Sequence, residues 1–239
     1  KAVVISGLDD VDSQEIVLMI NEFINSDAFD ISSPRLIYQG SDSELLNTIS
    51  ELKSGNISGI ITAGVNPGYT LPNAEEFLNL VNKLEFSLCF SMKEDETANS
   101  CKYVAATPHY LESWGDYEFK TGHYYLSQPT IKPLFDTNQF QDVILTLSGS
   151  NNNFYDEIKN NWRSNILKGK TWGKSLQDGF YYSYENNIPR RIKTSANLVN
   201  LPIQNTDELD LILYTKVGLG DGQQSSNPWL QEFPDPITR

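Results

Sequence analysis

The sequence predicts an α/β fold: a doubly wound, mostly parallel sheet with helices on both faces, followed by an irregular C-terminal extension with a few strands. Two observations predict it. Over the first hundred residues, short apolar runs alternate with segments whose apolar residues recur at helical spacing, which is typical of β-α-β units. After about residue 170 the helical period is lost and Tyr, Gly, Asn and Pro become frequent. We therefore expect an α/β lobe at residues 1–135 and, at residues 136–239, a helical and then irregular or β extension that packs on it.

The lobe begins inside an apolar run at residues 2–7, which predicts a strand and suggests a piece of a longer protein. Asp12 as N-cap, with Glu15 in the capping-box position, predicts a helix over 13–25. The later elements are a strand at 35–38, a helix marked by the apolar residues of 45–52 and ended by Gly55, a strand at 57–63, a helix at 73–83, and strands at 86–90 and 103–106.

The extension and the segment before it follow a different pattern. Aromatic and polar side chains alternate over 117–131, which predicts extended structure. Helices are expected at 140–147 and 154–167, separated by the turn-forming run 149–153. Beyond residue 171 the one expected element is a strand at 210–215.

Charge and composition exclude several classes of protein. The net charge is −13, and residues 1–150 account for it with 8 Lys and Arg against 21 Asp and Glu, whereas residues 151–239 contain 10 of each. Such a lobe repels nucleic acid and anionic lipid, and its acidic surface is either simply solvated or faces a cationic protein partner. No apolar run approaches 18 residues, so no membrane-spanning helix is expected. Two cysteines, Cys89 and Cys101, exclude a four-thiolate cluster and a disulfide scaffold.

The most suggestive local element is the loop 64–69, which directly follows the expected strand at 57–63. Loops at the carboxyl ends of parallel strands expose backbone N–H groups to ligands. The spacing matches neither the dinucleotide fingerprint nor a phosphate-binding P-loop, so a tight βα turn is the alternative interpretation.

Other chemistry-bearing residues form no recognised constellation. Glu94, Asp95 and Glu96 would complement the dipole of a helix that begins there. The one cluster of histidines and carboxylates fits no standard metal template and consists of His109, Glu112, Asp116 and His123. No nucleophile elbow is present, and Cys89 falls in an apolar strand where a thiol is inert. Residue chemistry alone therefore predicts no active site.

Four segments nevertheless follow one another in a familiar order and spacing: 60–67 (IITAGVNP), 95–98 (DETA), 108–116 (PHYLESWGD) and 128–134 (QPTIKPL). The chain resembles the molybdopterin oxidoreductases, in which a GxNP loop, an ETA turn and an LExxG stretch occur in this sequence. Within that family it is most similar to the iron–sulfur B subunit of alternative complex III, a bacterial quinol:cytochrome c oxidoreductase. Residues 109–116 and 227–236 are the parts most like that subunit.

The resemblance implies a vestigial cofactor cleft. In molybdenum enzymes these loops line a bis-pterin guanine dinucleotide, whereas the B subunit lacks molybdenum and binds its clusters in a separate cysteine-rich domain. Gly115-Asp116 replaces the usual Gly-Thr, Gly122-His123 replaces the usual Gly-Arg, and an acidic lobe suits phosphates poorly. We therefore expect no cofactor, no metal and no catalytic residue in this piece. The expected vestigial cleft consists of Gly64, Asn66, Pro67, Glu96, Thr97, His109, Glu112, Gly115 and Asp116.

The function that the resemblance implies is that of a structural scaffold within a respiratory electron-transfer complex. Its partners would be a ferredoxin-like domain of the same subunit, carrying the iron–sulfur clusters, and other subunits of the complex. Contact with nucleic acid and direct insertion into the membrane are not expected. The piece itself would be soluble and its parent exported to the periplasmic face. Two alternatives are a molybdopterin-binding lobe of a molybdenum oxidoreductase and a small-molecule-binding α/β module that uses the loop 64–70.

Overall fold

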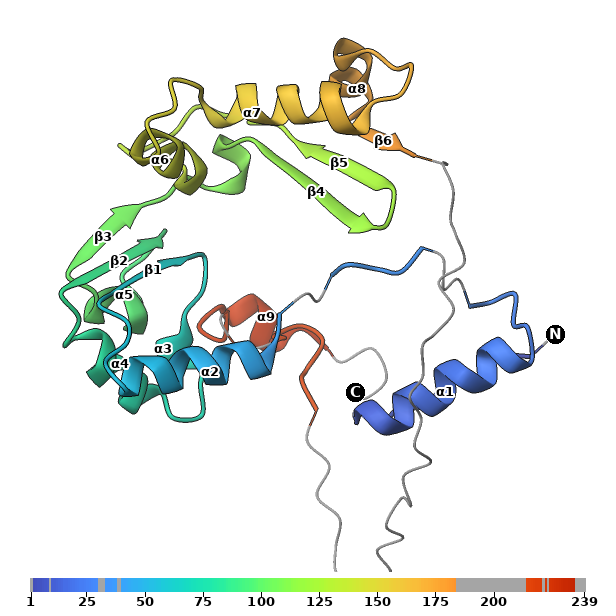
Figure 1. The fold of residues 1–239 in the computed structure, drawn as a ribbon, viewed down its shortest axis with the longest axis horizontal. Coiled ribbons are helices and arrows are strands. Elements are labelled where there is room, and N and C mark those ends of the chain that lie inside the picture. Colours follow the sequence, from blue (N-terminus) through green and yellow to red (C-terminus); the bar gives the residue numbers. More distant parts are fainter. Residues whose placement is uncertain are drawn as a thin grey trace, which may run out of the picture. The chain divides into compact units, whose positions relative to one another are not determined.

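The computed structural model describes residues 2–8, 10–29, 33–37, 40–183, 214–220, 222 and 224–234. They form a mixed α/β structure that contains a parallel three-stranded sheet with helices and a second, antiparallel sheet (Figure 1). The α/β class expected from the sequence is therefore confirmed.

The chain divides into two compact units, and each unit is assembled from segments that are distant in sequence. The first contains residues 1–39, 117–125 and 167–211, and the second contains residues 40–116, 126–166 and 212–239. The parallel sheet lies in the second unit. The boundary expected near residue 135 stays a prediction.

The parallel sheet has the strand order β1-β2-β3, with β1 at Gly59–Ala63, β2 at Phe86–Ser91 and β3 at Tyr103–Ala106. These strands confirm the expectations for 57–63, 86–90 and 103–106. Three helices connect them, α3 (Pro67–Thr70), α4 (Ala74–Val81) and α5 (Glu96–Ser100). Because all three strands run the same way, the loops after β1 and β2 leave the sheet at one carboxyl edge.

One face of this sheet is covered by α4 and by α2 (Asp42–Lys53). Ser41 caps α2 by accepting from the backbone N–H of Glu44, and Gly55 follows its end with a φ of 73°, as the sequence predicts. The buried core residues here are Leu52, Phe77, Val81 and Leu84, against which Ile60 of β1 packs.

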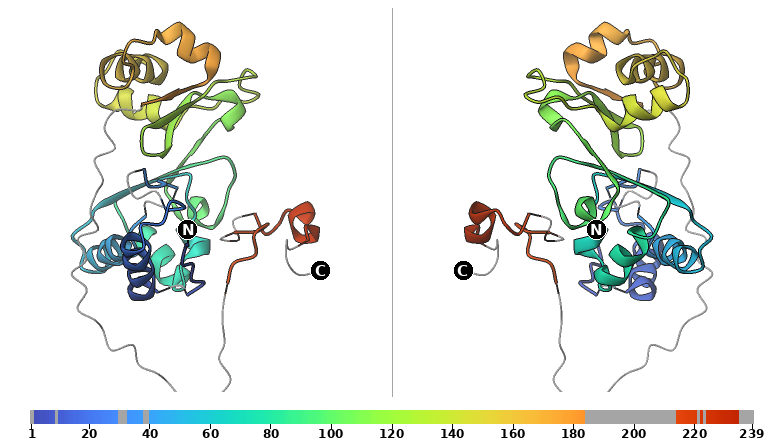
Figure 2. Two further views of the ribbon diagram at one scale, coloured as in Figure 1. Left: turned by 90° about the vertical axis from the view of Figure 1, so that its right-hand side faces the viewer. Right: turned by 90° about the vertical axis from the view of Figure 1, so that its left-hand side faces the viewer.

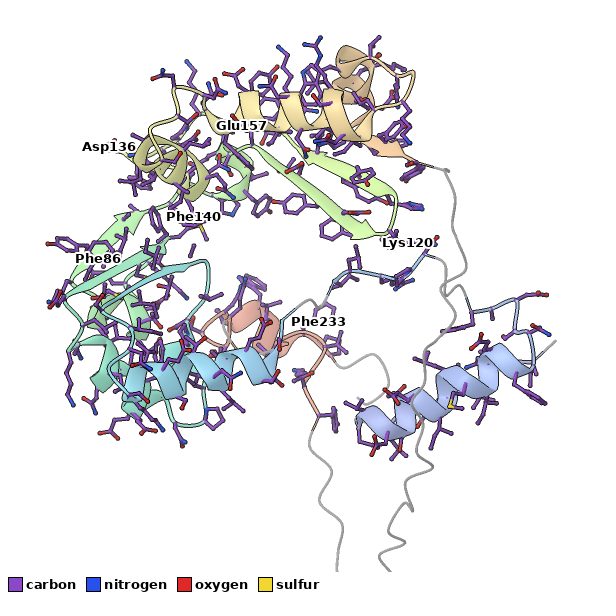
Figure 3. All side chains as sticks on the ribbon, viewed as in Figure 1. Phe86, Lys120, Asp136, Phe140, Glu157 and Phe233 are labelled. Atoms are coloured by element: carbon purple, nitrogen blue, oxygen red, sulfur yellow. The ribbon has the colours of Figure 1, made fainter. Side chains whose placement is uncertain are left out.

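The opposite face is contacted by α6 (Phe140–Leu147). Phe90 of β2 is 1% exposed, and its ring lies 5.0 Å from that of Phe140 in an edge-to-face arrangement. Phe140 is labelled in Figure 3. Ile60 pairs with Ser87, three residues before Phe90, so Ile60 and Phe90 project from opposite faces. Helices therefore contact both faces of the sheet.

The N-terminal segment corrects two expectations. Residues 2–7 are not in a strand among the described residues; instead the Asn21 side chain binds both backbone groups of Val4, with N–O distances of 2.9 and 2.8 Å. This amide takes the place of a neighbouring strand. The helix α1 spans Val11–Phe23 and is capped by Asp10, not Asp12, because Asp10 accepts from the backbone N–H of Ser13 at 2.8 Å.

The antiparallel sheet has the order β4-β5-β6, with β4 at Gly115–Lys120, β5 at His123–Ser127 and β6 at Phe180–Tyr182 (Figure 2). Extended structure within 117–131 is thus confirmed. The strand expected at 35–38 is reduced, in the described residues, to a single bridge between Arg35 and Lys120.

Several helical segments of the described residues were not expected, and α8 is the longest of them. Helix α8 spans Trp172–Asp178, where the sequence shows no clear helical period, because seven residues complete less than two turns of an apolar stripe. Thr171 caps it by accepting from the N–H of Lys174, Gly179 ends it with a φ of 76°, and Asp178 pairs with Lys170 at 2.8 Å.

The helices expected at 140–147 and 154–167 are confirmed. Helix α6 begins and ends where predicted, and 154–167 forms α7 (Phe154–Asn161) followed by the π-helix η2 (Trp162–Ile166). The other helical segments are a 3₁₀-helix, η1 (Tyr110–Glu112), and a short α9 (Pro228–Glu232). The strand expected at 210–215 falls mostly outside the described residues, and Tyr214 and Thr215 are irregular. Among the helices that the structure describes, none is long and apolar enough to cross a membrane.

Candidate functional site

The carboxyl edge of the parallel sheet is organised around the side chain of Asn66. Its Nδ2 donates to Oε2 of Glu96 at 2.7 Å, and its Oδ1 accepts from the backbone N–H of Thr97 at 3.2 Å and from Oγ1 of Thr97 at 2.7 Å. Both ends of the amide are therefore used. Asn66 thus joins the loop after β1 to the start of α5 after β2.

The loop after β1 is held at further points. The backbone N–H of Gly64 donates to the carbonyl of Phe90 at 3.2 Å, and the φ of Gly64 is 66°, a value that favours glycine. Pro67 occupies the first turn of α3, where no N–H is needed. The N–H of Gly68 donates to Oγ1 of Thr97, which is fully buried, at 2.9 Å. The loop after β1 is therefore held in place by hydrogen bonds to other parts of the same chain.

The acidic run at the start of α5 has a structural role, as the helix-dipole interpretation predicts. Asp95 caps α5, since its Oδ1 accepts from the N–H of Ala98 at 2.9 Å and its Oδ2 accepts from Oγ of Ser91 at 3.2 Å. At the start of this helix the backbone N–H groups of Thr97 and Ala98 therefore both donate to side chains of the chain itself.

Gly68 is packed too closely to carry a side chain. A Cβ there would lie 2.7 Å from Cδ2 of Leu78 and 3.1 Å from the N and Oγ1 of Thr97. We expect Gly68→Ala to lower the free energy of unfolding by about 1–3 kcal/mol through overpacking. Gly173→Ala, at a helical position with nothing within 4 Å, is the matched control. It should raise that free energy by about 0.4–1 kcal/mol. Urea unfolding of both variants tests the pair, and equal effects would contradict this packing.

His109 and Glu112 form a second network of hydrogen bonds. The N–H of His109 donates to Oε2 of Glu112 at 2.9 Å, Nδ1 of His109 accepts from the N–H of Leu111 at 3.3 Å, and Oε1 of Glu112 accepts from the N–H of Leu134 at 3.0 Å. This is a capping box around η1. Through its bond from Leu134, Glu112 also connects the loop near residue 134 to η1.

Gly115 and Asp116 belong to a third network. Gly115 is buried at the start of β4, and Oδ2 of Asp116 accepts from Nε1 of Trp162 at 3.0 Å. Trp162 is fully buried and was missed as a site residue. Its signal was available, because Ile158, Trp162 and Ile166 recur at helical spacing and are all buried. Across the described ranges no three His, Cys, Asp or Glu side chains form a group that could hold a metal ion.

The Glu96 carboxylate gives the carboxyl edge a pH dependence. The hydrogen bond from Asn66 is the main reason that the pKa of Glu96 lies below its ordinary value of 4.5. A lowered folded-state pKa stabilises the fold above the unfolded-state pKa, and this contribution is lost as the pH falls through the folded-state value. Between pH 6 and 3 the wild type should therefore lose more stability than Glu96→Gln. Asn66→Ala removes the hydrogen bond that lowers the pKa of Glu96, so it should reduce the dependence of stability on pH in the same way. Thermal unfolding that shows the same loss of stability between pH 6 and 3 in the wild type and in both variants would contradict this.

Comparisons with known proteins place the chain in a broader context. No family model matches it. It is 34% identical over 88 residues to the molybdopterin-binding-like subunit of menaquinone reductase from Nitratidesulfovibrio vulgaris strain Hildenborough. The chain is distantly related to that subunit. The match covers 35% of this chain and 13% of the relative, so the chain corresponds to a small part of that protein.

Among solved structures the chain shows partial similarity to acetylene hydratase from Pelobacter acetylenicus, with a TM-score of 0.45 and 16% sequence identity, over 56% of this chain and 20% of that one. The partial match to the menaquinone reductase subunit agrees with the resemblance to molybdopterin oxidoreductases that was expected from the sequence. The closer resemblance to the B subunit of alternative complex III stays a prediction.

Proposed function

We propose that this chain is part of a molybdopterin-oxidoreductase-like subunit of a bacterial respiratory electron-transfer complex, where it serves as a scaffold without a cofactor of its own. The distant homology to a menaquinone reductase subunit supports the class of protein. The observation that carries the scaffold role is the network around Asn66, in which the polar groups of two strand-end loops bind each other.

The groups of this edge do not fit the phosphates of a pterin dinucleotide. Proteins hold phosphates with Arg, Lys and backbone N–H groups that point outward. Here the N–H groups of Gly68, Thr97 and Ala98 donate to side chains of the chain itself. The loop 64–70 contains no Lys or Arg, and the run 93–96 contains one lysine against three carboxylates. No reaction step is therefore assigned to this edge.

In this proposal the other two networks fasten segments of the scaffold. Glu112 joins η1 to the loop near residue 134 through hydrogen bonds from two backbone N–H groups, those of His109 and Leu134. Asp116 joins β4 to η2 through Trp162. Glu112 and Asp116 therefore have a structural role. In this proposal the iron–sulfur clusters that carry electrons belong to a ferredoxin-like domain of the parent subunit, on the exported side of the membrane.

The experiment is purification of the tagged parent protein from the membranes of its source. We expect it to co-purify in stoichiometric amounts with iron–sulfur and membrane subunits, in a fraction that oxidises a quinol. A parent that purifies alone, without quinol-oxidising activity, would contradict the respiratory role. Asp116→Asn, which keeps an acceptor for Trp162, is a suitable control for effects of folding on assembly.

A further inference from the structure

The start of α5 and the segment that follows β1, including the first turn of α3, are where a phosphate-bearing ligand would have to contact this sheet edge. Three backbone N–H groups lie there, and each has a specific side-chain acceptor: Thr97 Oγ1 for Gly68, Asn66 Oδ1 for Thr97, and Asp95 Oδ1 for Ala98. The N–O distances are 2.9, 3.2 and 2.9 Å, which are ordinary hydrogen bonds.

From this arrangement we infer that the chain's own side chains close the carboxyl edge to phosphate groups, with Asn66 and Asp95 as the closing residues. This inference rests on the proposed function and names the residues responsible. Two effects act together. A phosphate would have to displace the three acceptors to reach the donors, and it would approach the carboxylates of Asp95 and Glu96.

Two of the three acceptor side chains are buried, which keeps them on their N–H donors. Thr97 is fully buried and Asn66 is 9% exposed, so the acceptors of Gly68 and Thr97 cannot simply rotate into solvent. A buried N–H that loses its acceptor costs free energy, which opposes any rearrangement that would free these donors.

The first part of the test is a titration of the chain with guanosine diphosphate and with pyrophosphate at low salt, followed by amide chemical shifts. We expect no saturable shifts at residues 64–70 and 95–98 up to millimolar ligand. The variant Asp95→Asn with Glu96→Gln keeps both acceptors and removes both charges, and we expect it to stay unbound as well. Glu51→Gln with Glu85→Gln removes two charges elsewhere and is the matched control.

The second part is amide hydrogen exchange, which reports on the donors directly. Asn66→Ala should speed exchange at Thr97 by about tenfold, the equivalent of one hydrogen bond, and leave Ala98 unchanged. Asp95→Ala should do the reverse. Exchange that changes equally at both amides in either variant would overturn the assignment of separate closing residues.

The outcomes separate this inference from the proposed function. Saturable binding at the edge of the wild type overturns the inference, and binding by the neutralised variant alone shows that charge, not occupied donors, keeps phosphate out, which also overturns it. A parent protein that fails to purify with a respiratory complex contradicts the proposed function and leaves the closed edge intact.

Discussion

Trp162→Ala is expected to lower the free energy of unfolding by about 3–5 kcal/mol, because a fully buried indole leaves a large cavity when it is truncated. The change also removes the N–H that Asp116 accepts at 3.0 Å. Urea unfolding followed by circular dichroism measures the loss.

The matched control is Trp229→Ala, the same truncation at a residue that is 81% exposed, which should change the free energy of unfolding by no more than about 0.5 kcal/mol. Trp162→Phe keeps most of the ring and loses the hydrogen bond, so its cost should fall between the two. Similar effects of Trp162→Ala and Trp229→Ala would show that η2 does not pack as described.

Phe90→Ala should have a comparable effect, about 3–5 kcal/mol, since the ring is 1% exposed and packs on Phe140 of α6. The substitution should also disturb the loop after β1, because the backbone carbonyl of residue 90 accepts from the N–H of Gly64. Calorimetry measures the stability, and amide exchange at Gly64 measures the effect on the loop.

Two substitutions serve as controls for Phe90. Phe135→Ala removes the same ring from a position that is 79% exposed and should be nearly neutral. Phe90→Leu fills most of the volume and should cost less than about 1.5 kcal/mol. A Phe90→Ala variant as stable as Phe135→Ala would mean that α6 does not cover this face of the sheet.

The elements that could be predicted from the sequence are those whose signals are local. Helix α6 has a clear apolar period, and α2 has apolar residues at helical spacing and a terminal glycine, so both were expected at nearly the right positions. The three parallel strands are short apolar runs between such helices. These features depend on neighbouring residues and need no knowledge of the fold.

Two elements could not be predicted, for different reasons. Residues 2–7 have the composition of a strand, but Asn21, seventeen positions after Val4, supplies the hydrogen bonds that a neighbouring strand would supply. Helix α8 has local signals in Thr171 and Gly179, but seven residues are too few to show an apolar period.

The candidate site shows the same division. Asn66 and Glu96 could be placed at neighbouring strand ends from the order of elements, whereas their contact depends on the register of β1 and β2. The three-residue spacing of His109 and Glu112 is a capping-box signal that was visible in the sequence, yet it was considered as part of a metal cluster. The burial of Trp162 follows from its helical spacing with Ile158 and Ile166, whereas its hydrogen bond to Asp116 spans 46 positions and has no local signal.

The central claim is that this lobe is a scaffold that holds no molybdenum cofactor, and the metal content of the intact parent protein tests it most directly. Molybdenum and iron should be measured by mass spectrometry on the parent purified from its source, together with an ultraviolet–visible spectrum. We expect iron with an iron–sulfur absorption band and molybdenum far below one atom per chain. Stoichiometric molybdenum with a bound pterin dinucleotide would contradict the account.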